Sequence, residues 1–395
     1  MKNQKFLILC VLLVLLPFMS AWAADFGLIF DNIAGFSGNG NENSFDYKGL
    51  LIPRFTGLIG NTGEFYISVG ARADYQQKEW TFVPELLRTD LFFRFGKPAI
   101  RVGRMSYTDP LGYIANGLFD GARFTLNSAA GTFGLGAWYT GLLYKNRAII
   151  TMTDKEYASY SEKVDLSNFM DTYFAPKRVV ASLEWEHPSL ANFLVMNLAV
   201  LGQFDLSDEE LNSEYAVLSI AFPFKSFIFD IGGCFELIQN SGKSGKAFSA
   251  DVGFTWALPT PFASQLGLTG RYSTGSSSSF DPFLPLTTVT QSNILKPKLS
   301  GISLFSLEYL ARVHQTFSFS LSSVYFMRND LQTYSGFGSS GKMLGNEFFG
   351  KFYWSPVSDL QMSLRAGMFL PSMGNVAPDA KGLWRAEFGV ILALF

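Results

Sequence analysis

Hydrophobic and polar residues alternate with a period of two along most of the chain. Between 247 and 258 the sequence AFSADVGFTWAL places Phe248, Trp256 and other apolar residues on one face, and polar residues on the other. Segments 64–74 and 316–328 alternate in the same way. A period of two is typical of β-strands with one apolar face, whereas the faces of a helix repeat every 3.6 residues. The pattern therefore predicts an all-β protein.

The connections between the expected strands alternate in length. Short turns are expected at 60–63, 96–98, 128–131, 187–191, 224–226, 259–263, 313–314 and 355–358. Longer polar connections are expected at 37–44, 76–79, 106–117, 145–177, 205–213, 239–246, 274–299, 329–345 and 371–381. A soluble β-sandwich also alternates along its strands, but tight hairpins at one end and long loops at the other are typical of outer-membrane barrels. We therefore expect one domain over 24–395, a transmembrane antiparallel β-barrel of about 18 strands (roughly 16 to 18) with both termini periplasmic.

The segment 1–23 has the features of a cleaved secretory signal peptide. Lys2 and Lys5 precede an apolar run over 6–16, and Ala21-Trp22-Ala23 forms a small-x-small cleavage site. The apolar run is shorter than the roughly 20 residues that a membrane-spanning helix needs, which argues against an N-terminal anchor. The sequence therefore predicts export.

The composition agrees with an exported membrane barrel. Of the 395 residues, 48% are hydrophobic, 16% aromatic and 16% charged, against roughly 25% charged in soluble domains. After the signal no stretch reaches the roughly 18 consecutive apolar residues of a membrane-spanning helix. Cleavage would change the net charge from −2 to −4 by removing Lys2 and Lys5, and would leave Cys234 without a cysteine partner. A charge this close to neutral gives no reason to expect nucleic acid as a partner.

The last expected strand resembles the assembly signal of outer-membrane barrels. Residues 382–395 end in Phe395 and place Trp384, Phe388 and Leu394 on one apolar face. A C-terminal aromatic residue is the feature that the barrel-assembly machinery recognises in this class, so we expect that machinery as a partner. The apolar residues of this strand have even numbers, so in a regular strand they would lie on the face opposite to Phe395. This indicates either a bulge or a variant signal.

Charged residues gather on the inward faces of three successive strands. Arg88, Asp90 and Arg94 share one face of 82–95, and further arginines follow on the next two strands. The residues expected to line the pore are Arg72, Asp74, Arg88, Asp90, Arg94, Arg101, Arg104, Asp120 and Arg123. Because neighbouring strands lie about 4.8 Å apart, the arginines would form a ladder on one wall, and guanidinium groups suit carboxylates, phosphates and sulfates. Three interpretations stay open: the charges pair with one another across the wall, they form a basic constriction for anionic or polar solutes, or the assumed register places some of these residues on the wrong face.

Two short motifs in this region resemble a known family. The run Arg101-Val102-Gly103-Arg104, followed after a glycine-containing loop by Phe119-Asp120-Gly121-Ala122-Arg123, is similar to the GRQ and FDG-x-R elements of alginate-export-type outer-membrane barrels. The resemblance covers about residues 88–127, and Met105 stands where that family often has Gln. It implies a barrel of similar strand number with an arginine-rich pore for an anionic polysaccharide.

The sequence gives little support to an enzyme. Barrel hydrolases need a His with Ser or Asp at the outer rim, whereas His187 and His314 both fall in expected periplasmic turns. One mature cysteine and two distant histidines provide no metal site, and no cofactor is expected. Gly131-Thr132-Phe133-Gly134-Leu135-Gly136 lies on a strand without a following helix, so it does not predict a phosphate-binding loop.

The sequence thus predicts a porin-like channel in the outer membrane of a diderm bacterium. Small hydrophilic solutes, with a bias toward anionic or saccharide-like ones, would diffuse through the lumen, and lipid would surround the wall. The alternative is a plugged barrel whose long loops, 145–177 above all, act as a surface-exposed binding or adhesin-type protein. Association into a homo-oligomer is left open.

Overall fold

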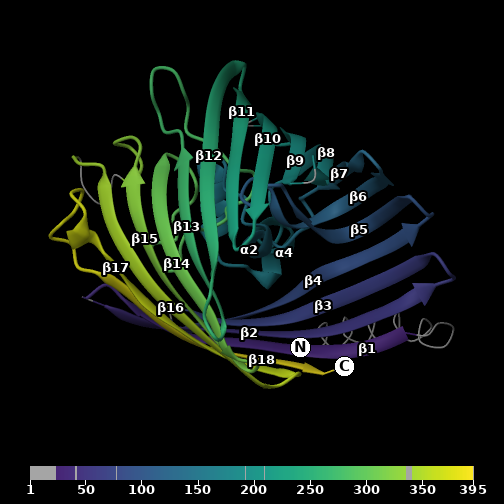
Figure 1. Ribbon diagram of the computed structural model, residues 1–395, viewed down its shortest axis with the longest axis horizontal. Helices are drawn as coiled ribbons and strands as arrows, with labels where there is room; N and C mark the ends of the chain where they lie inside the picture. The colour runs from purple at the N-terminus through teal and green to yellow at the C-terminus, as the bar shows by residue number, and fades with distance from the viewer. Residues whose placement is uncertain are drawn as a thin grey trace.

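The computed structural model describes residues 24–40, 42–76, 78–191, 193–208, 210–334 and 340–394. Within these residues 18 strands form one antiparallel sheet that closes on itself (Figure 1). The strands are β1 (Ala24–Gly38), β2 (Asn43–Ile59), β3 (Gly63–Gln76), β4 (Glu79–Arg94), β5 (Pro98–Thr108), β6 (Asn116–Ser128), β7 (Gly131–Tyr139), β8 (Arg178–Leu190), β9 (Leu194–Asp205), β10 (Leu211–Phe224), β11 (Phe227–Asn240), β12 (Lys243–Leu258), β13 (Ala263–Ser273), β14 (Ile302–His314), β15 (Phe317–Arg328), β16 (Met343–Val357), β17 (Leu360–Leu370) and β18 (Leu383–Leu394). The expected antiparallel barrel of about 18 strands is therefore confirmed.

The sheet closes where its first strand meets its last. Strand β1 pairs with β2 on one edge and with β18 on the other, with Leu28 opposite Leu394. Ala24 lies opposite Gly57, close to the β2–β3 turn, so both ends of the described barrel lie at the end with the short turns. The expected signal peptide at 1–23 and the terminal Phe395 lie outside the described residues.

Several expected connections differ from the structure in extent. The segments 76–79 and 239–246 were expected as longer connections, but β3–β4 and β11–β12 are tight hairpins whose polar ends continue the strand pairing. Ser241 and Gly242 have φ values of 46° and 82°, which produce the sharp reversal between β11 and β12. His187 and His314 were expected in turns. They instead lie near the ends of β8 and β14, opposite Met196 and Phe317.

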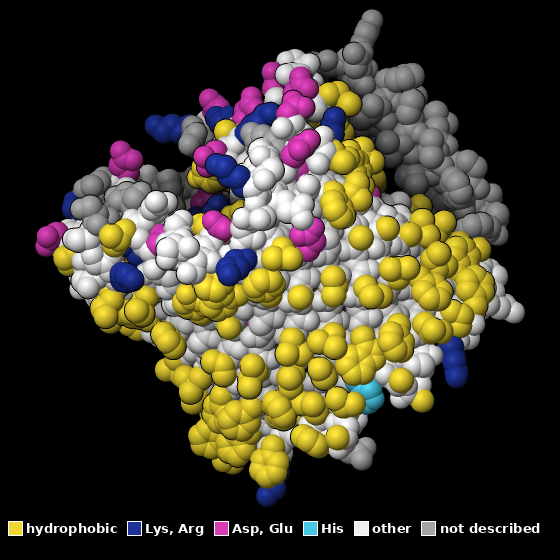
Figure 2. Space-filling view, turned by 90° about the horizontal axis from the view of Figure 1, so that it is seen from above, with side chains coloured by type: hydrophobic (Ala, Val, Ile, Leu, Met, Phe, Trp, Pro, Cys, Tyr) yellow, Lys and Arg dark blue, Asp and Glu magenta, His cyan; other side chains and the backbone are white. Residues whose placement is uncertain are grey.

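The outer surface of the barrel is apolar, as the alternation predicts. Val252, Leu321 and Phe388 belong to the expected outward faces, and 56%, 49% and 50% of their surfaces are exposed. Figure 2 shows one side of the molecule, where hydrophobic side chains cover the wall and most charged side chains in view gather at one end. An exposed apolar surface this large would be unfavourable in water and is expected for a wall that faces lipid.

Three loops fold into the barrel from the end opposite the short turns. They are the 109–115 loop, the 140–177 loop and the 274–301 loop. The 140–177 loop carries α2 (Lys145–Ala148), α3 (Asp154–Ser161), η2 (Leu166–Asn168) and α4 (Phe169–Thr172), and Figure 1 shows α2 and α4 inside the ring of strands. In the part of the chain that is described, no helix has the length and apolar character to cross a membrane.

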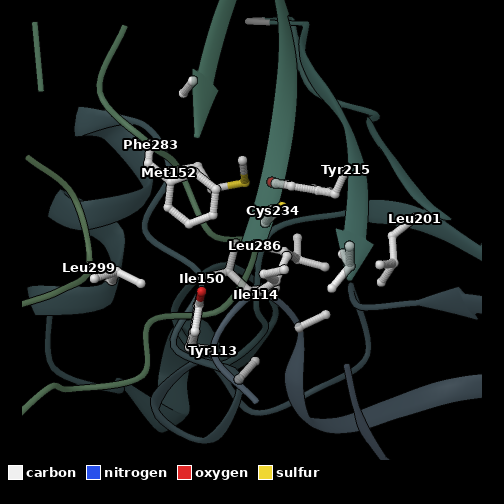
Figure 3. Packing of buried hydrophobic residues seen from close by; sticks show 14 of the residues in the cluster. Tyr113, Ile114, Ile150, Met152, Leu201, Tyr215, Cys234, Phe283, Leu286 and Leu299 are labelled. Atoms are coloured by element: carbon white, nitrogen blue, oxygen red, sulfur yellow. The ribbon is translucent and has the colours of Figure 1, made fainter. Parts of the chain in front are cut away.

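The three loops share one hydrophobic cluster with the inner wall. Figure 3 shows Ile114, Met152 and Phe283, one from each loop, packed near Tyr215 of β10 and Cys234 of β11. Their main chains are also hydrogen bonded to each other: the Thr287 N–H donates to Ile114 and the Thr288 N–H to Ile149. The lumen beside β9–β12 is therefore filled by ordered loops.

Candidate functional site

The basic side of the lumen is formed by three arginines on adjacent strands. Arg88 lies on β4, Arg101 on β5 opposite Phe92, and Arg123 on β6 opposite Arg101. Their side chains keep 36%, 33% and 38% of their surfaces exposed. Three guanidinium groups on one wall are therefore within reach of a solute.

One carboxylate serves two of these arginines. The Arg88 guanidinium donates to both oxygens of Asp90, at 3.3 Å for Nη2 to Oδ1, and Arg101 Nη1 lies 3.4 Å from Asp90 Oδ1. Only 2% of the Asp90 side chain is exposed. The carboxylate is thus covered by the two guanidinium groups, so the pair of arginines keeps one excess positive charge toward the lumen.

Aromatic rings support the same arginines. The Arg88 guanidinium lies 4.4 Å from the ring centre of Tyr66, and that of Arg101 lies 4.8 Å from the ring centre of Phe92. Cation–π contacts of this length hold a guanidinium flat while leaving its N–H edge free for an acceptor. Arg94 is an exposed residue at the short-turn end of β4, and its guanidinium lies 5.5 Å from the ring centre of Phe92.

Arg123 is paired across a strand of small residues. Its guanidinium donates to the Glu184 carboxylate on β8, across β7, and lies 5.9 Å from the ring centre of Tyr107. A β-carbon on Gly134 would lie 3.4 Å from Arg123 Nη2 and 3.1 Å from Glu184 Oε2. The glycines of the 131–136 segment thus leave room for an ion pair on the inner wall.

Arg104 and Asp120 lie on the other face of their strands. Arg104 pairs with Asp120 across β5 and β6. Because Arg104 is three residues from Arg101 and side chains alternate along a strand, the two arginines point to opposite faces. Arg104 Nε donates to Asp120 Oδ1 at 2.7 Å, and its other N–H groups donate to the carbonyls of Leu86 and Leu142. Only 5% of the Arg104 side chain is exposed, so it joins β4, β6 and the 140–177 loop.

Arg72 and Asp74 belong to a second cluster, further along the lumen. Arg72 lies 3.7 Å from Asp74 and 3.3 Å from Glu85, and Glu85 also accepts from Arg147 at 2.7 Å. Because Arg147 lies on α2, this cluster ties the 140–177 loop to the wall.

The sequence did not reveal Glu85. The pairing of β3 with β4 shifts by one residue, so the odd-numbered residues of β4 face inward before Arg88 and the even-numbered ones after it. Alternation along β8 would have identified Glu184.

Carboxylates also fix the other two inward loops. Asp109 accepts four backbone N–H bonds within its own loop, including those of Ile114 and Ala115 at 2.8 and 2.9 Å. Burial raises the pKa of Asp109 above its usual value despite these bonds. Glu347 on β16 accepts the backbone N–H groups of 293–295 at 2.9 to 3.1 Å, and Glu236 on β11 accepts that of Leu284 at 2.8 Å. The 274–301 loop is thus attached to the wall at two points.

A small cavity of about 180 Å³ adjoins the arginines. Arg123, Glu184, Glu186 and Asn197 line it together with Pro110 of the 109–115 loop. It therefore offers one cationic and two anionic side chains to a solute beneath the inward loops. Among the described residues, no group of three or more His, Cys, Asp or Glu side chains is placed to hold a metal ion.

Comparison with known proteins identifies relatives of the fold. No protein-family model matches the sequence, and no curated protein does. Solved structures from Pseudomonas aeruginosa do match over 94% of this chain. OccK5 (OpdH) is 14% identical with a TM-score of 0.62 over 98% of its own chain, and OpdQ is 12% identical with 0.63 over 99%. OccK2 (OpdF) in complex with glucuronate is 11% identical with 0.62 over 96%. At these identities the likeness establishes the shared barrel fold.

Proposed function

We propose that this protein is an outer-membrane channel through which small hydrophilic solutes, preferentially anionic ones, diffuse passively. The observation that carries the proposal is the row of exposed guanidinium groups on β4, β5 and β6, of which Arg88 and Arg101 share the single carboxylate of Asp90. Positive charge on the wall of a lumen favours anions. The structural similarity to OccK2, whose structure contains glucuronate, supports a channel for organic anions.

Conductance in planar lipid bilayers tests the channel. Purified protein should give discrete conductance steps, and a salt gradient should give a reversal potential that indicates anion preference. Arg88→Ala and Arg123→Ala should each shift the reversal potential toward cation preference. Arg94→Ala, at the short-turn end of β4, should act in the same direction. The absence of conductance steps after verified insertion would contradict the channel, and unchanged selectivity in all three variants would remove the arginines from the proposal.

A plugged barrel that acts through its surface loops is the second candidate. It is favoured by the three inward loops, whose shared cluster fills the lumen beside β9–β12. The exposed side chains of Leu142, Tyr157 and Met170 on the 140–177 loop would then form a binding surface. A barrel of this kind would insert into bilayers without conducting, so the same recordings separate the two functions.

The resemblance to alginate-export barrels rests on the motifs around Arg101 and Arg123 alone. The matching solved structures include those of Occ and OprD proteins, which add no support for a polysaccharide cargo. Small anions therefore remain the preferred class of solute.

The remaining parts of the proposal concern location and assembly. A signal peptide over 1–23 would direct the chain across the inner membrane, and cleavage would leave the barrel domain 24–395. The barrel would then sit in the outer membrane with its short turns and both termini in the periplasm. Phe395 would serve as the signal for the barrel-assembly machinery. Chemical cross-linking in outer membranes would test whether protomers associate.

A further inference from the structure

The wall of the barrel is split between β4 and β5. Within the described residues, β4 pairs with β5 only over 89–94. Beyond this ladder β4 continues back to Glu79, paired with β3, and β5 continues to Thr108, paired with β6. Figure 1 shows the two strands diverging from each other. We call the break between 79–88 of β4 and 105–108 of β5 the fork.

The edge of β4 at the fork is not built to pair with another strand. The carbonyl of Pro84 accepts from the Tyr173 hydroxyl at 2.9 Å, and that of Leu86 accepts from Arg104 Nη1 at 2.7 Å. The N–H and C=O of a strand residue point to the same side, so the position at which Pro84 lacks a donor faces the fork. Proline is typical of strand edges that stay unpaired. The fork is therefore encoded in the sequence.

Side chains of the 140–177 loop close the fork from inside the barrel. Val83 on β4 packs against Tyr144 and Tyr173, and all three are at most 5% exposed. The rings of Tyr144 and Tyr173 stack at 4.9 Å, and Phe169 stacks on Tyr173 at 4.3 Å. We call Tyr144, Phe169 and Tyr173 the aromatic plug. Because side-chain contacts stand here in place of a ladder, the fork can open without unfolding a strand.

The fork joins an apolar outer face to the basic side of the lumen. On the outer face of β4, 62% of Phe82 and 43% of Leu86 are exposed. On the inner wall the exposed guanidinium groups of Arg88 and Arg101 lie where the ladder ends. Arg88 and Val83 are five positions apart, which is roughly 17 Å along a strand. A carboxylate at the arginines could therefore extend an apolar tail to the plug.

We propose that the fork is a lateral exit from the lumen into the membrane for anionic amphiphiles such as medium-chain carboxylates. The inference rests on the proposed function, because it requires the membrane location and the solute-accessible arginines. A fully hydrophilic anion gains nothing from the apolar rings, whereas an amphiphile can exchange its contacts with the plug for hydrocarbon. A free strand edge can also bind an added strand from another chain, but the missing donor of Pro84 opposes that use of β4.

Uptake of radiolabelled dodecanoate by bacterial cells that lack other fatty-acid channels tests the exit. The Lys163 ammonium donates to the Glu79 carboxylate, which joins the loop to the tip of β4 next to Val164 of the plug region. A Glu79→Cys, Lys163→Cys variant can be bridged there with a bismaleimide that contains a cleavable disulfide. Bridging should abolish most of the uptake, and a reductant should restore it.

The matched control is a Glu214→Cys, Gln239→Cys variant bridged with the same reagent. These side chains are hydrogen bonded at 3.2 Å between β10 and β11, away from the fork, so bridging them should leave uptake unchanged. Heat-modifiable migration in gels should confirm that both variants fold.

Three results would overturn the exit. They are a wild-type protein that takes up no dodecanoate, uptake that bridging at the fork does not change, and a bridged fork that also loses conductance, which would assign the plug to the main pathway. Conductance in planar bilayers also separates the exit from the proposed function. Bridge-sensitive uptake without conductance steps would contradict the channel alone, whereas conductance with bridge-insensitive uptake would contradict the exit alone.

Discussion

Gly103 on β5 lies directly against the main chain of Thr89 on β4. A β-carbon on Gly103 would stand 2.3 Å from the Thr89 carbonyl oxygen, and the φ of Gly103 is 117°, a conformation that favours glycine. The contact adjoins the pair of Thr89 and Arg104, where the described β4–β5 ladder ends. Glycine is therefore needed at the point where these strands separate and Arg104 joins them to the 140–177 loop.

Gly103→Ala should destabilise the barrel by about 1 to 3 kcal/mol, the cost of holding a non-glycine residue in a strained conformation, with the clash added to it. Urea-dependent folding and unfolding in lipid vesicles measures the difference. Gly202→Ala is the control, because its β-carbon would meet only ordinary contacts. Equal urea midpoints for the two variants would show that the β4–β5 contact yields without cost.

Glu184→Ala should increase anion preference, because it removes the carboxylate that pairs with Arg123. Arg123→Ala should have the opposite effect, and the double variant should return toward the wild-type selectivity. Reversal potentials under a salt gradient measure all three. If Glu184→Ala left the potential unchanged, the Arg123 charge would not be sensed by the permeating ions.

Glu347→Ala should loosen the 274–301 loop. The carboxylate accepts three consecutive backbone N–H groups at 293–295, and buried donors without an acceptor cost on the order of 1 to 3 kcal/mol each. Hydrogen exchange at 293–295 should become faster, and single-channel current should become noisier. Glu347→Gln keeps one carbonyl acceptor and should show a smaller effect. Identical exchange in wild type and Glu347→Ala would mean that other contacts hold the loop.

Anion preference should fall as the pH rises from 8 toward 10. Lys296 and Lys298 are exposed residues of the 274–301 loop, where partial loss of solvation lowers the pKa of each, and the nearby charges of Arg385 and Lys48 lower that of Lys296 further. Both ammonium groups therefore lose their protons below the usual lysine range, and the 274–301 loop loses positive charge. Reversal potentials measured across this range test the effect. The Lys296→Gln, Lys298→Gln variant should show a flatter profile, and a fall of equal size in that variant would assign the titration to other groups.

The fold could be predicted from the sequence because its main signal is local. Alternation along 247–258 and 316–328 depends only on which side of a pleated strand each residue lies, and a barrel wall imposes that pattern throughout. The lumen could not be predicted as well. The inward packing of the 140–177 and 274–301 loops depends on contacts between distant segments, such as Thr288 with Ile149.

Register also limited the prediction of the site. The period-two alternation placed Arg88 and Asp90 on the same face. It did not place Glu85 there, because the register shift between β3 and β4 moves the residues before Arg88 to the other face. Arg101 and Gly103 lie on one face of β5, whereas the next residue, Arg104, lies on the opposite face. Whether the nine charged residues expected in the pore contact solute stays a prediction that the conductance variants address.

The pairing of Leu28 with Leu394 sets an order of events for biogenesis. The seam between β1 and β18 joins strands that lie far apart in the sequence, so the ring cannot close before β18 is available to pair. Closure then requires the pairing of largest sequence separation among the described strands, which is slow to form unaided. The first strand must wait, unpaired on one edge and prone to join other chains, until the last residues arrive. Any factor that shields this edge of β1 would therefore act before β18 pairs with it.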